Sequence, residues 1–268
     1  MKRLLIILFS FGFPFFVEGK PNNEQPPNII FLLTDDHRFD ALGAAGNPYI
    51  KTPFLDRLAQ QGIRFQNAYT TTSICSVSRA SILSGQYMSR HGIDNFEKNF
   101  TPLSFRNTYP MLLKKNGYKI GFIGKYGVGN NPPEKEFDYW ACNKSGQPPY
   151  QYVRQDGSSI HHTDSVALGI EQFLTQFGTQ APFCLSVSFK APHELDGSPP
   201  TYPVQERFLS LYNDISIPQP ETADPQYWHS FPDFFRTDQN IGRERWKPLL
   251  STPELYQQTV KDYYRLIT

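Results

Sequence analysis

Apolar and polar positions alternate along the chain in blocks that predict strands and helices. The run Ile29–Leu33 is continuously apolar, which is typical of a strand covered on both faces by helices. The next block, PFLDRLAQQG at 53–62, has apolar residues at helical spacing between an initial proline and a final glycine, and it predicts a helix. The segment IRFQNAY at 63–69 then predicts a second strand.

The same order recurs further along the chain. YPMLLKKNG at 109–117 predicts a helix closed by its glycine, YKIGFIG at 118–124 a strand, DSVALGIEQFLTQFG at 164–178 an amphipathic helix, and APFCLSVSF at 181–189 another strand. This alternation predicts an α/β fold with a mostly parallel central sheet and helices on both faces. Beyond residue 192 the pattern loosens into a stretch rich in proline and aromatic residues.

Polar residues follow three of the predicted strands. Asp35 and Asp36 end the first, Lys125 follows IGFIG, and His193 follows LSVSFKAP. Ligands of parallel α/β sheets collect at the carboxyl ends of the strands. We therefore expect these side chains to converge at one edge of the sheet.

The amino terminus has the pattern of a secretory signal. Residues 1–19 contain two basic residues, an apolar stretch and a small-residue exit near Gly19. The apolar stretch from 4 to 17 is short for a bilayer crossing and is broken by Gly12 and Pro14. We expect a secreted or periplasmic protein, without stable membrane insertion after cleavage, that retains residues 20–268 as one domain.

Charge and cysteine content narrow the candidate functions. The chain has 26 Lys and Arg against 25 Asp and Glu, so no net field attracts nucleic acid or an anionic membrane. Three cysteines, at 75, 142 and 184, leave at least one outside any internal disulfide after export.

Two candidate centres emerge from local chemistry. Asp35 and Asp36 are adjacent carboxylates that a hard cation such as Ca²⁺ or Mg²⁺ would hold together, although a solvated turn or helix cap would use the same residues. Cys75 precedes a predicted helix, where the positive dipole end and Arg79 at i+4 would favour an anion. A small buried thiol beside a surface arginine is the alternative.

Lys125 and His193 carry weaker signals. Glycines around Lys125 allow close approach to a ligand, and His193 could protonate a leaving oxygen, although each residue is also common in ordinary loops. The chain contains no G-x-S-x-G, G-x-G-x-x-G or G-x-x-x-x-G-K-[ST] motif, which argues against a serine hydrolase, a dinucleotide enzyme and a P-loop protein.

Taken together, five ordered blocks resemble the sulfatase family of the alkaline phosphatase-like superfamily, from about Pro27 to the end of the chain. They are PNIIFLLTDDHRFDALG, KTPFLDRLAQQGIRFQNAYTTTSICSVSRASILSGQY, GYKIGFIGKYGVG, EKEFDYW and PFCLSVSFKAPH. The resemblance implies an alkaline phosphatase-like fold. It also implies a sulfuric ester hydrolase that acts on a sulfated carbohydrate.

The resemblance also assigns roles to single residues. Cys75 corresponds to the cysteine that a formylglycine-generating or maturase enzyme oxidises to formylglycine, whose hydrate attacks sulfur. Asp35 and Asp36, with modified Cys75, would hold Ca²⁺ or Mg²⁺. Arg79 would orient and stabilise the formylglycine, and Lys125 would bind the sulfate. His193 would face the leaving group.

Three departures from the family pattern stand out. Val77 replaces the usual proline or alanine of the motif that the modifying enzyme reads, and Gly127 replaces a histidine that would contact the sulfate or nucleophile. The family's second pair of metal ligands follows a helix that resembles TPELYQQTVKDYYRLIT, inside which this sequence stops, so we expect an incomplete N-terminal catalytic domain. We do not count Asp238 and Asn240 as substitutes, because they follow SFPDFF and not an apolar strand.

Two other functions remain open from the sequence. A phosphate or phosphonate monoester hydrolase of the same superfamily would need a similar cationic centre. A non-catalytic protein that binds sulfated glycans would account for the three departures.

Overall fold

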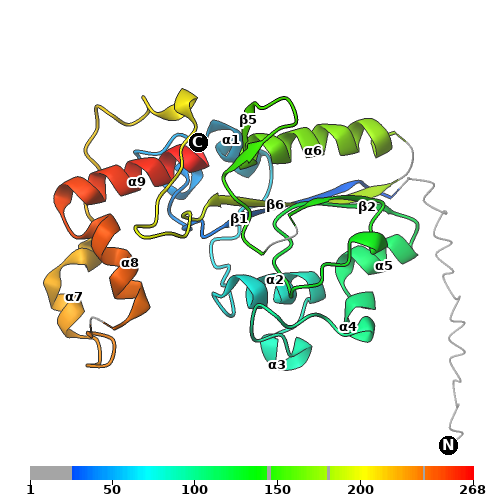
Figure 1. The fold of residues 1–268 in the computed structure, drawn as a ribbon, viewed down its shortest axis with the longest axis horizontal. Coiled ribbons are helices and arrows are strands. Elements are labelled where there is room, and N and C mark those ends of the chain that lie inside the picture. The colour runs from blue at the N-terminus through cyan, green and yellow to red at the C-terminus, as the bar shows by residue number, and fades with distance from the viewer. Residues whose placement is uncertain (1–25, 144–145, 180–181, 238) are drawn as a thin grey trace, which may run out of the picture.

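The centre of the protein is a sheet of four parallel strands in the order β1-β6-β2-β3. The computed structural model describes residues 26–143, 146–179, 182–237 and 239–268, arranged as Figure 1 shows. The strands of this sheet are β1 (Ile29–Asp35), β2 (Lys119–Gly124), β3 (Tyr139–Cys142) and β6 (Phe183–Pro192). Ile29 of β1 and Ile120 of β2 both lie beside Cys184 of β6, so the carboxyl ends of these strands share one edge.

Helices cover both faces of the sheet (Figure 1). One face carries α6 (His162–Phe177), and the other carries the segment from α2 to α5. The other helices are α1 (Pro53–Gln61), α2 (Cys75–Ser84), α3 (Met88–His91), α4 (Pro102–Arg106), α5 (Tyr109–Lys115), α7 (Pro225–His229), α8 (Ile241–Leu250) and α9 (Pro253–Ile267). Strands β4 (Gln151–Val153) and β5 (Ser159–His161) form a separate two-stranded sheet. Short 3₁₀ turns are η1 (Gly43–Ala45), η2 (Glu134–Glu136), η3 (Glu206–Phe208) and η4 (Glu221–Ala223). The predicted mostly parallel α/β fold is confirmed.

Alternate residues of β2 divide the core into two layers. Ile120 and Phe122 point towards α2 and pack against Leu83, whereas Ile123 points towards α6 and packs against Phe173. Fully burying an aliphatic or aromatic side chain contributes about 1.5–3 kcal/mol, so these two layers hold the helices on the sheet. The predicted elements at 109–117, 118–124, 164–178 and 181–189 are all present, with shifts of a few residues at their ends.

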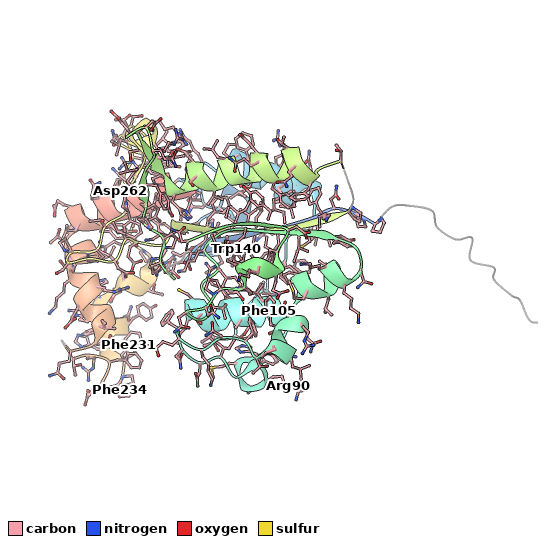
Figure 2. All side chains as sticks on the ribbon, turned by 45° about the vertical axis from the view of Figure 1, so that its right-hand side comes forward. Arg90, Phe105, Trp140, Phe231, Phe234 and Asp262 are labelled. Carbon is pink, nitrogen blue, oxygen red and sulfur yellow. The ribbon has the colours of Figure 1, made fainter. Side chains whose placement is uncertain are left out.

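The segment after β6 forms a separate group of helices at the carboxyl edge of the sheet. Helix α9 lies beside that edge, and α7 and α8 form a lobe below it (Figure 1). Trp140 belongs to β3 of the sheet, whereas Phe231 and Phe234 lie in the α7–α8 lobe and are exposed (Figure 2). The described residues of this segment add no strand to the central sheet, in agreement with the loosened sequence pattern.

Two predictions about strands are wrong. Residues 63–69 form no strand, and Ile63, Phe65 and Tyr69 are exposed, because no described strand lies beside them to complete a ladder. β1 is an edge strand covered on one face only: Ile30 and Leu32 point outward and are about half exposed. Apolar composition alone did not distinguish this edge strand from a central one.

The proposed signal peptide, residues 1–19, lies outside the described residues. Within the part of the chain that the structure describes, no helix combines the length and the apolar composition that a membrane crossing requires.

His162 opens α6 as a buried histidine. Its side chain stacks on the ring of Tyr152, and neither ring nitrogen has a hydrogen-bond partner among the described residues. Burial, together with the nearby charges of His161, Lys190 and Lys125, lowers the pKa of His162 to about 4. The folded protein therefore holds this ring neutral.

This burial predicts acid sensitivity. A histidine in the unfolded chain binds its proton near pH 6.5, whereas folded His162 binds one only near pH 4. Protonation therefore favours the unfolded chain as the pH falls from about 6.5 to about 4, and it lowers the free energy of unfolding by up to roughly 3 kcal/mol. His162→Phe keeps the stacking and removes this contribution. Urea unfolding should show a smaller loss of stability between about pH 7 and about pH 4.5 in the variant than in the wild type. The control is His229→Phe at an exposed site, which should lose as much stability as the wild type. An equal loss in His162→Phe and the wild type would contradict this explanation.

Candidate active site at the carboxyl edge of the sheet

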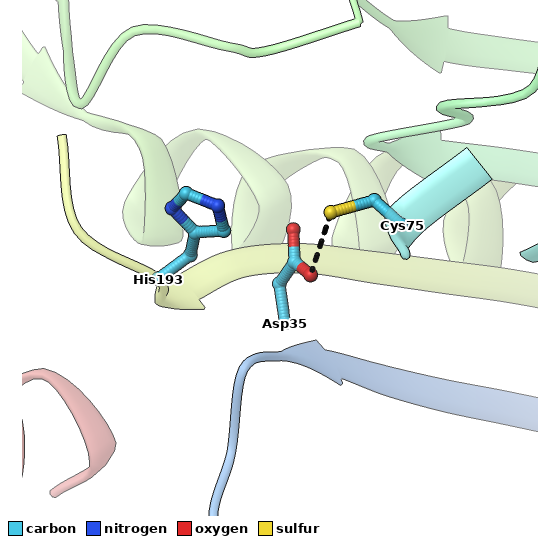
Figure 3. Close-up of side chains that lie close together, drawn as sticks. All are labelled: Asp35, Cys75 and His193. Atoms are coloured by element: carbon cyan, nitrogen blue, oxygen red, sulfur yellow. Dashed lines mark hydrogen bonds between the residues drawn. The ribbon is translucent and has the colours of Figure 1, made fainter. Parts of the chain in front are cut away.

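The polar side chains at the carboxyl ends of three strands lie close together, as the sequence predicted. Asp35 is the last residue of β1, Lys125 follows β2, and His193 follows β6, the strand that lies between the other two. Cys75, at the start of α2, reaches the same place from the face that carries α2 to α5, and its side chain points towards Asp35 (Figure 3). Four segments that are distant in sequence therefore build one centre.

Asp35 is the most constrained of these residues. Its side chain is only 8% exposed, and its Oδ2 accepts a hydrogen bond from Lys125 Nζ at 2.5 Å and lies 3.4 Å from Arg79 Nη2. Burial alone would raise the pKa of Asp35, but the charges of Arg79 and Lys125, with the hydrogen bond from Lys125, outweigh burial and lower it. The carboxylate is therefore held ionised inside the protein.

Arg79 joins α2 to the sheet. The guanidinium is almost fully buried, and its Nη1 donates to the carbonyl oxygen of Lys125 at 2.6 Å and also to the hydroxyl of Ser188. The Lys125 ammonium, equally buried, donates in addition to Gln147 Oε1 at 3.0 Å. Two fixed positive charges thus lie beside Asp35 and within the same centre as Cys75.

Cys75 is half-buried and lies at the amino-terminal end of α2. Its Sγ donates a long hydrogen bond to Asp35 Oδ1, at 3.9 Å (Figure 3). It forms no disulfide, and neither do the other two cysteines of the chain. Cys142 and Cys184 belong to the apolar layer beneath the sheet, and burial raises the pKa of each thiol, whereas Cys75 lies beside the carboxylate of Asp35.

His193 lies opposite Cys75 across Asp35. Its Nδ1 is 2.6 Å from the carbonyl oxygen of Glu194, and its Nε2 is 3.3 Å from Gln147 Nε2 and 3.5 Å from Asp36 Oδ2. Burial opposes the charged ring. The hydrogen bonds to Cys75 and Glu194 and the charges of Asp36 and Glu194 outweigh burial and raise the pKa of His193 to about 9. The ring is therefore a proton donor at neutral pH.

Asp36 occupies the outer side of the centre. Its backbone has φ 57°, in the left-handed region, which turns the chain sharply after β1. Its backbone carbonyl accepts a hydrogen bond from the hydroxyl of Tyr263 at 2.8 Å. Helix α9 therefore fixes the turn that presents the Asp36 carboxylate beside His193.

The donor groups suit a hard cation. Asp35, Cys75 and His193 offer ligand atoms within 4.8 Å of one another, and so do Asp36, His193 and Glu194. Both groups contain His193 and lie at the same edge of the sheet. Asp35, Asp36 and residue 75 therefore lie around the same part of the centre. Carboxylate oxygens are the ligands that Ca²⁺ and Mg²⁺ prefer, whereas a cationic histidine is a poor ligand.

Sequence reasoning missed several members of this centre. Glu194 follows His193 directly and could have been included on that ground. Gln147 lies in an irregular loop, and Ser188 lies within β6, where nothing in the local sequence marks either as a site residue. Asn240 caps α8, where its side chain accepts from the backbone N–H of Gly242 at 2.9 Å, and Asp238 lies outside the described residues.

The two substituted motif positions have structural roles. Val77 is completely buried in the layer beneath the sheet. Gly127 has φ +67°, and a Cβ atom there would lie 2.8 Å from Arg79 Cδ and 3.5 Å from Lys125 Cε. The space that a side chain at 127 would need is therefore already filled by Arg79.

The fold and this centre define a parallel α/β protein that gathers cationic, carboxylate and thiol groups at the carboxyl edge of its sheet. The family model described as Sulfatase matches residues 27–268, and the chain belongs to that family.

Named relatives and solved structures agree with this assignment. The chain is 31% identical to an N-acetylglucosamine-6-O-sulfatase of Bacteroides thetaiotaomicron over 78% of its own length and 38% of the relative. It is 33% identical to the human N-sulphoglucosamine sulphohydrolase over 66% of its length and 34% of the relative. A structure solved in complex with its substrate D-glucosamine-2-N,6-O-disulfate superposes with a TM-score of 0.66 at 26% identity, covering 90% of this chain and 59% of the other.

A phosphonate monoester hydrolase of Agrobacterium radiobacter shares the fold, with a TM-score of 0.61 at 19% identity over 90% of this chain and 56% of the other. The chain therefore spans less than half of these two named relatives and less than two thirds of these two solved structures.

The contact at Gly127 predicts a specific loss of stability. Gly127→Ala combines an unfavourable φ with a clash against Arg79, which together should lower the free energy of unfolding by roughly 2–4 kcal/mol. Gly117→Ala is the matched control, because Gly117 has φ +87° but no atom within 4 Å of an added Cβ, and it should cost about 1 kcal/mol. Denaturant unfolding of both variants measures the difference. Equal losses would show that Arg79 does not fill the space beside residue 127.

Proposed function

We propose that this chain is the catalytic part of a sulfuric ester hydrolase that acts on a sulfated carbohydrate of the glycosaminoglycan type. The observation that supports it most is the meeting of Asp35, Cys75, Arg79, Lys125 and His193 at one edge of the sheet. These are the residues to which the family resemblance assigns roles, and membership of the Sulfatase family adds support.

Position 75 would provide the nucleophile. Conversion of Cys75 to formylglycine by a modifying enzyme would supply a hydrated aldehyde, one hydroxyl of which attacks sulfur and the other of which later releases sulfate. Asp35, Asp36 and residue 75 would hold Ca²⁺ or Mg²⁺, which would supply a positive charge for the sulfate oxygens. Export of the protein, proposed from residues 1–19, would bring it to sulfated glycans outside the cytoplasm.

The chain's own cations would bind and orient the ester. Arg79 and Lys125 are buried and held by several hydrogen bonds, so their charges need little rearrangement when negative charge develops on the sulfate oxygens. Arg79 lies one helical turn after Cys75 and would steady the modified side chain. Lys125 approaches from β2 and would bind a sulfate oxygen.

His193 would protonate the leaving oxygen of the sugar. The charges of Asp36 and Glu194 favour the protonated ring, and the carbonyl of Glu194 fixes the orientation of Nδ1. Nε2 is directed towards Asp36 and Gln147, at the outer side of the centre. A proton held there would favour departure of a poor leaving group such as a sugar hydroxyl.

The preference for glycosaminoglycan-type sugars has support from the relatives. Their names specify N-acetylglucosamine-6-O-sulfate and N-sulphoglucosamine groups, and the substrate in one structural neighbour carries both kinds of sulfate. The alternative function, a phosphonate monoester hydrolase, has weaker support, because the similarity to such an enzyme shows a shared fold alone.

Mass spectrometry and turnover test the proposal together. In a host that contains the modifying enzyme, the peptide with Cys75 should lose about 18 Da on conversion of the thiol to the aldehyde. With Ca²⁺ or Mg²⁺ present, aryl sulfate turnover should exceed aryl phosphate turnover at least roughly tenfold, and Cys75→Ala should abolish it. Faster phosphate turnover would favour the alternative hydrolase.

A known sulfatase expressed in the same host is the positive control for modification. If that control is converted while Cys75 keeps its thiol, the catalytic proposal fails. The protein would then be a non-catalytic one, and sulfated-glycan binding that persists in Cys75→Ala would support that function.

A further inference from the structure

A large cavity opens beside the catalytic centre and has no part in the mechanism above. It has a volume of about 580 Å³ and lies between α8, α9 and the loops that contain residues 38–49 and 217–223. Aromatic side chains dominate its walls, among them Tyr49, Tyr202, Trp246, Tyr256 and Tyr263. This volume is within the range of about 300–1,000 Å³ typical of small-molecule sites.

Tyr263 belongs both to the wall of the cavity and to the outer side of the centre. The hydroxyl of Tyr263 donates to the carbonyl oxygen of Asp36 at 2.8 Å and accepts from the backbone N–H of Arg38 at 2.8 Å. The ring of Tyr202 packs edge-on against that of Tyr263, with 6.0 Å between ring centroids. The wall of the cavity therefore reaches the turn that carries Asp36.

The polar groups of the cavity indicate a neutral ligand. Arg38 and Asp40 both line it, and they form a bidentate pair with bonds of 2.9 and 2.7 Å. The pair has no net charge but offers exposed donors and acceptors, which suits hydroxyl groups better than a second sulfate. Aromatic rings, in turn, present apolar faces on which the C–H face of a sugar ring can stack.

We propose that this cavity binds an uncharged saccharide unit next to the sulfated sugar of the substrate. The inference rests on the proposed function, because Tyr263 joins the wall of the cavity to the sulfate-binding centre, which makes the adjoining part of the same glycan the ligand that fits this position. If the cavity binds this unit, Trp246 and Tyr202 determine the preference for oligosaccharides over monosaccharides.

The α7–α8 lobe provides a matched pair of variants. The guanidinium of Arg243 lies between Trp246 and Trp228, 4.5 Å from each ring centroid. Trp246→Ala and Trp228→Ala therefore remove the same residue type and the same contact with Arg243. Only Trp246 lines the cavity.

Ligand-observed NMR titration of the full chain with two probes tests the proposal. The unsulfated disaccharide of N-acetylglucosamine reports on the cavity, and D-glucosamine-2-N,6-O-disulfate reports on the catalytic centre. Trp246→Ala should weaken disaccharide binding roughly tenfold, the loss expected for one stacked aromatic ring, while Trp228→Ala leaves it unchanged. Neither variant should change binding of the sulfated monosaccharide.

A second variant blocks the cavity instead of opening it. Ala223→Trp places a large ring at the cavity wall and should also abolish disaccharide binding. Circular dichroism checks that each variant is folded. A wild type that does not bind the disaccharide, or equal losses in the Trp246 and Trp228 variants, would overturn the inference.

The two probes separate this inference from the proposed function. Disaccharide binding that depends on Trp246, without any binding of the sulfated monosaccharide, would support the cavity site and count against the sulfatase proposal. Binding of the monosaccharide alone would support the catalytic centre and overturn the saccharide site.

Discussion

The buried carboxylate of Asp35 is the constraint on which the rest of the centre depends. A carboxylate with so little exposure remains ionised only beside compensating charge, and here Lys125 and Arg79 supply it from β2 and α2. The same two cations hold further bonds to Ser188 and Gln147. Satisfying one charge therefore fixes the relative positions of β1, β2, β6 and α2.

This arrangement serves folding and the proposed chemistry with the same groups. The positive charges that compensate Asp35 lie beside Cys75, where a sulfate ester would need them, and they are oriented before any ligand binds. In this chain the buried Arg79 also occupies the space beside Gly127 that a side chain there would need. On the outer side, Tyr263 ties the backbone of Asp36 to α9 and so connects the centre to the aromatic cavity.

The sequence predicted the features that depend on local pattern. β2, β6, α5 and α6 follow from apolar periodicity with glycine and proline signals, and the convergence of Asp35, Lys125 and His193 follows from the geometry of parallel strands. Features that depend on neighbours distant in sequence were not predictable. The segment 63–69 has strand composition but no partner, β1 lies at an edge, and Gln147 reaches the centre from an irregular loop. Trp246 gains its place in the cavity only from the packing of α8 beside α9.

A double-mutant cycle on Asp35 and Lys125 tests the central claim most directly. Asp35→Asn and Lys125→Met should each lower the free energy of unfolding by roughly 3–5 kcal/mol, because each leaves a buried charge with less compensation. The double variant should lose clearly less than the sum of the single losses, with a coupling of about 2 kcal/mol, measured by denaturant unfolding without added metal. Additivity within about 0.5 kcal/mol would contradict the account, since it would mean that the carboxylate and the ammonium do not depend on each other.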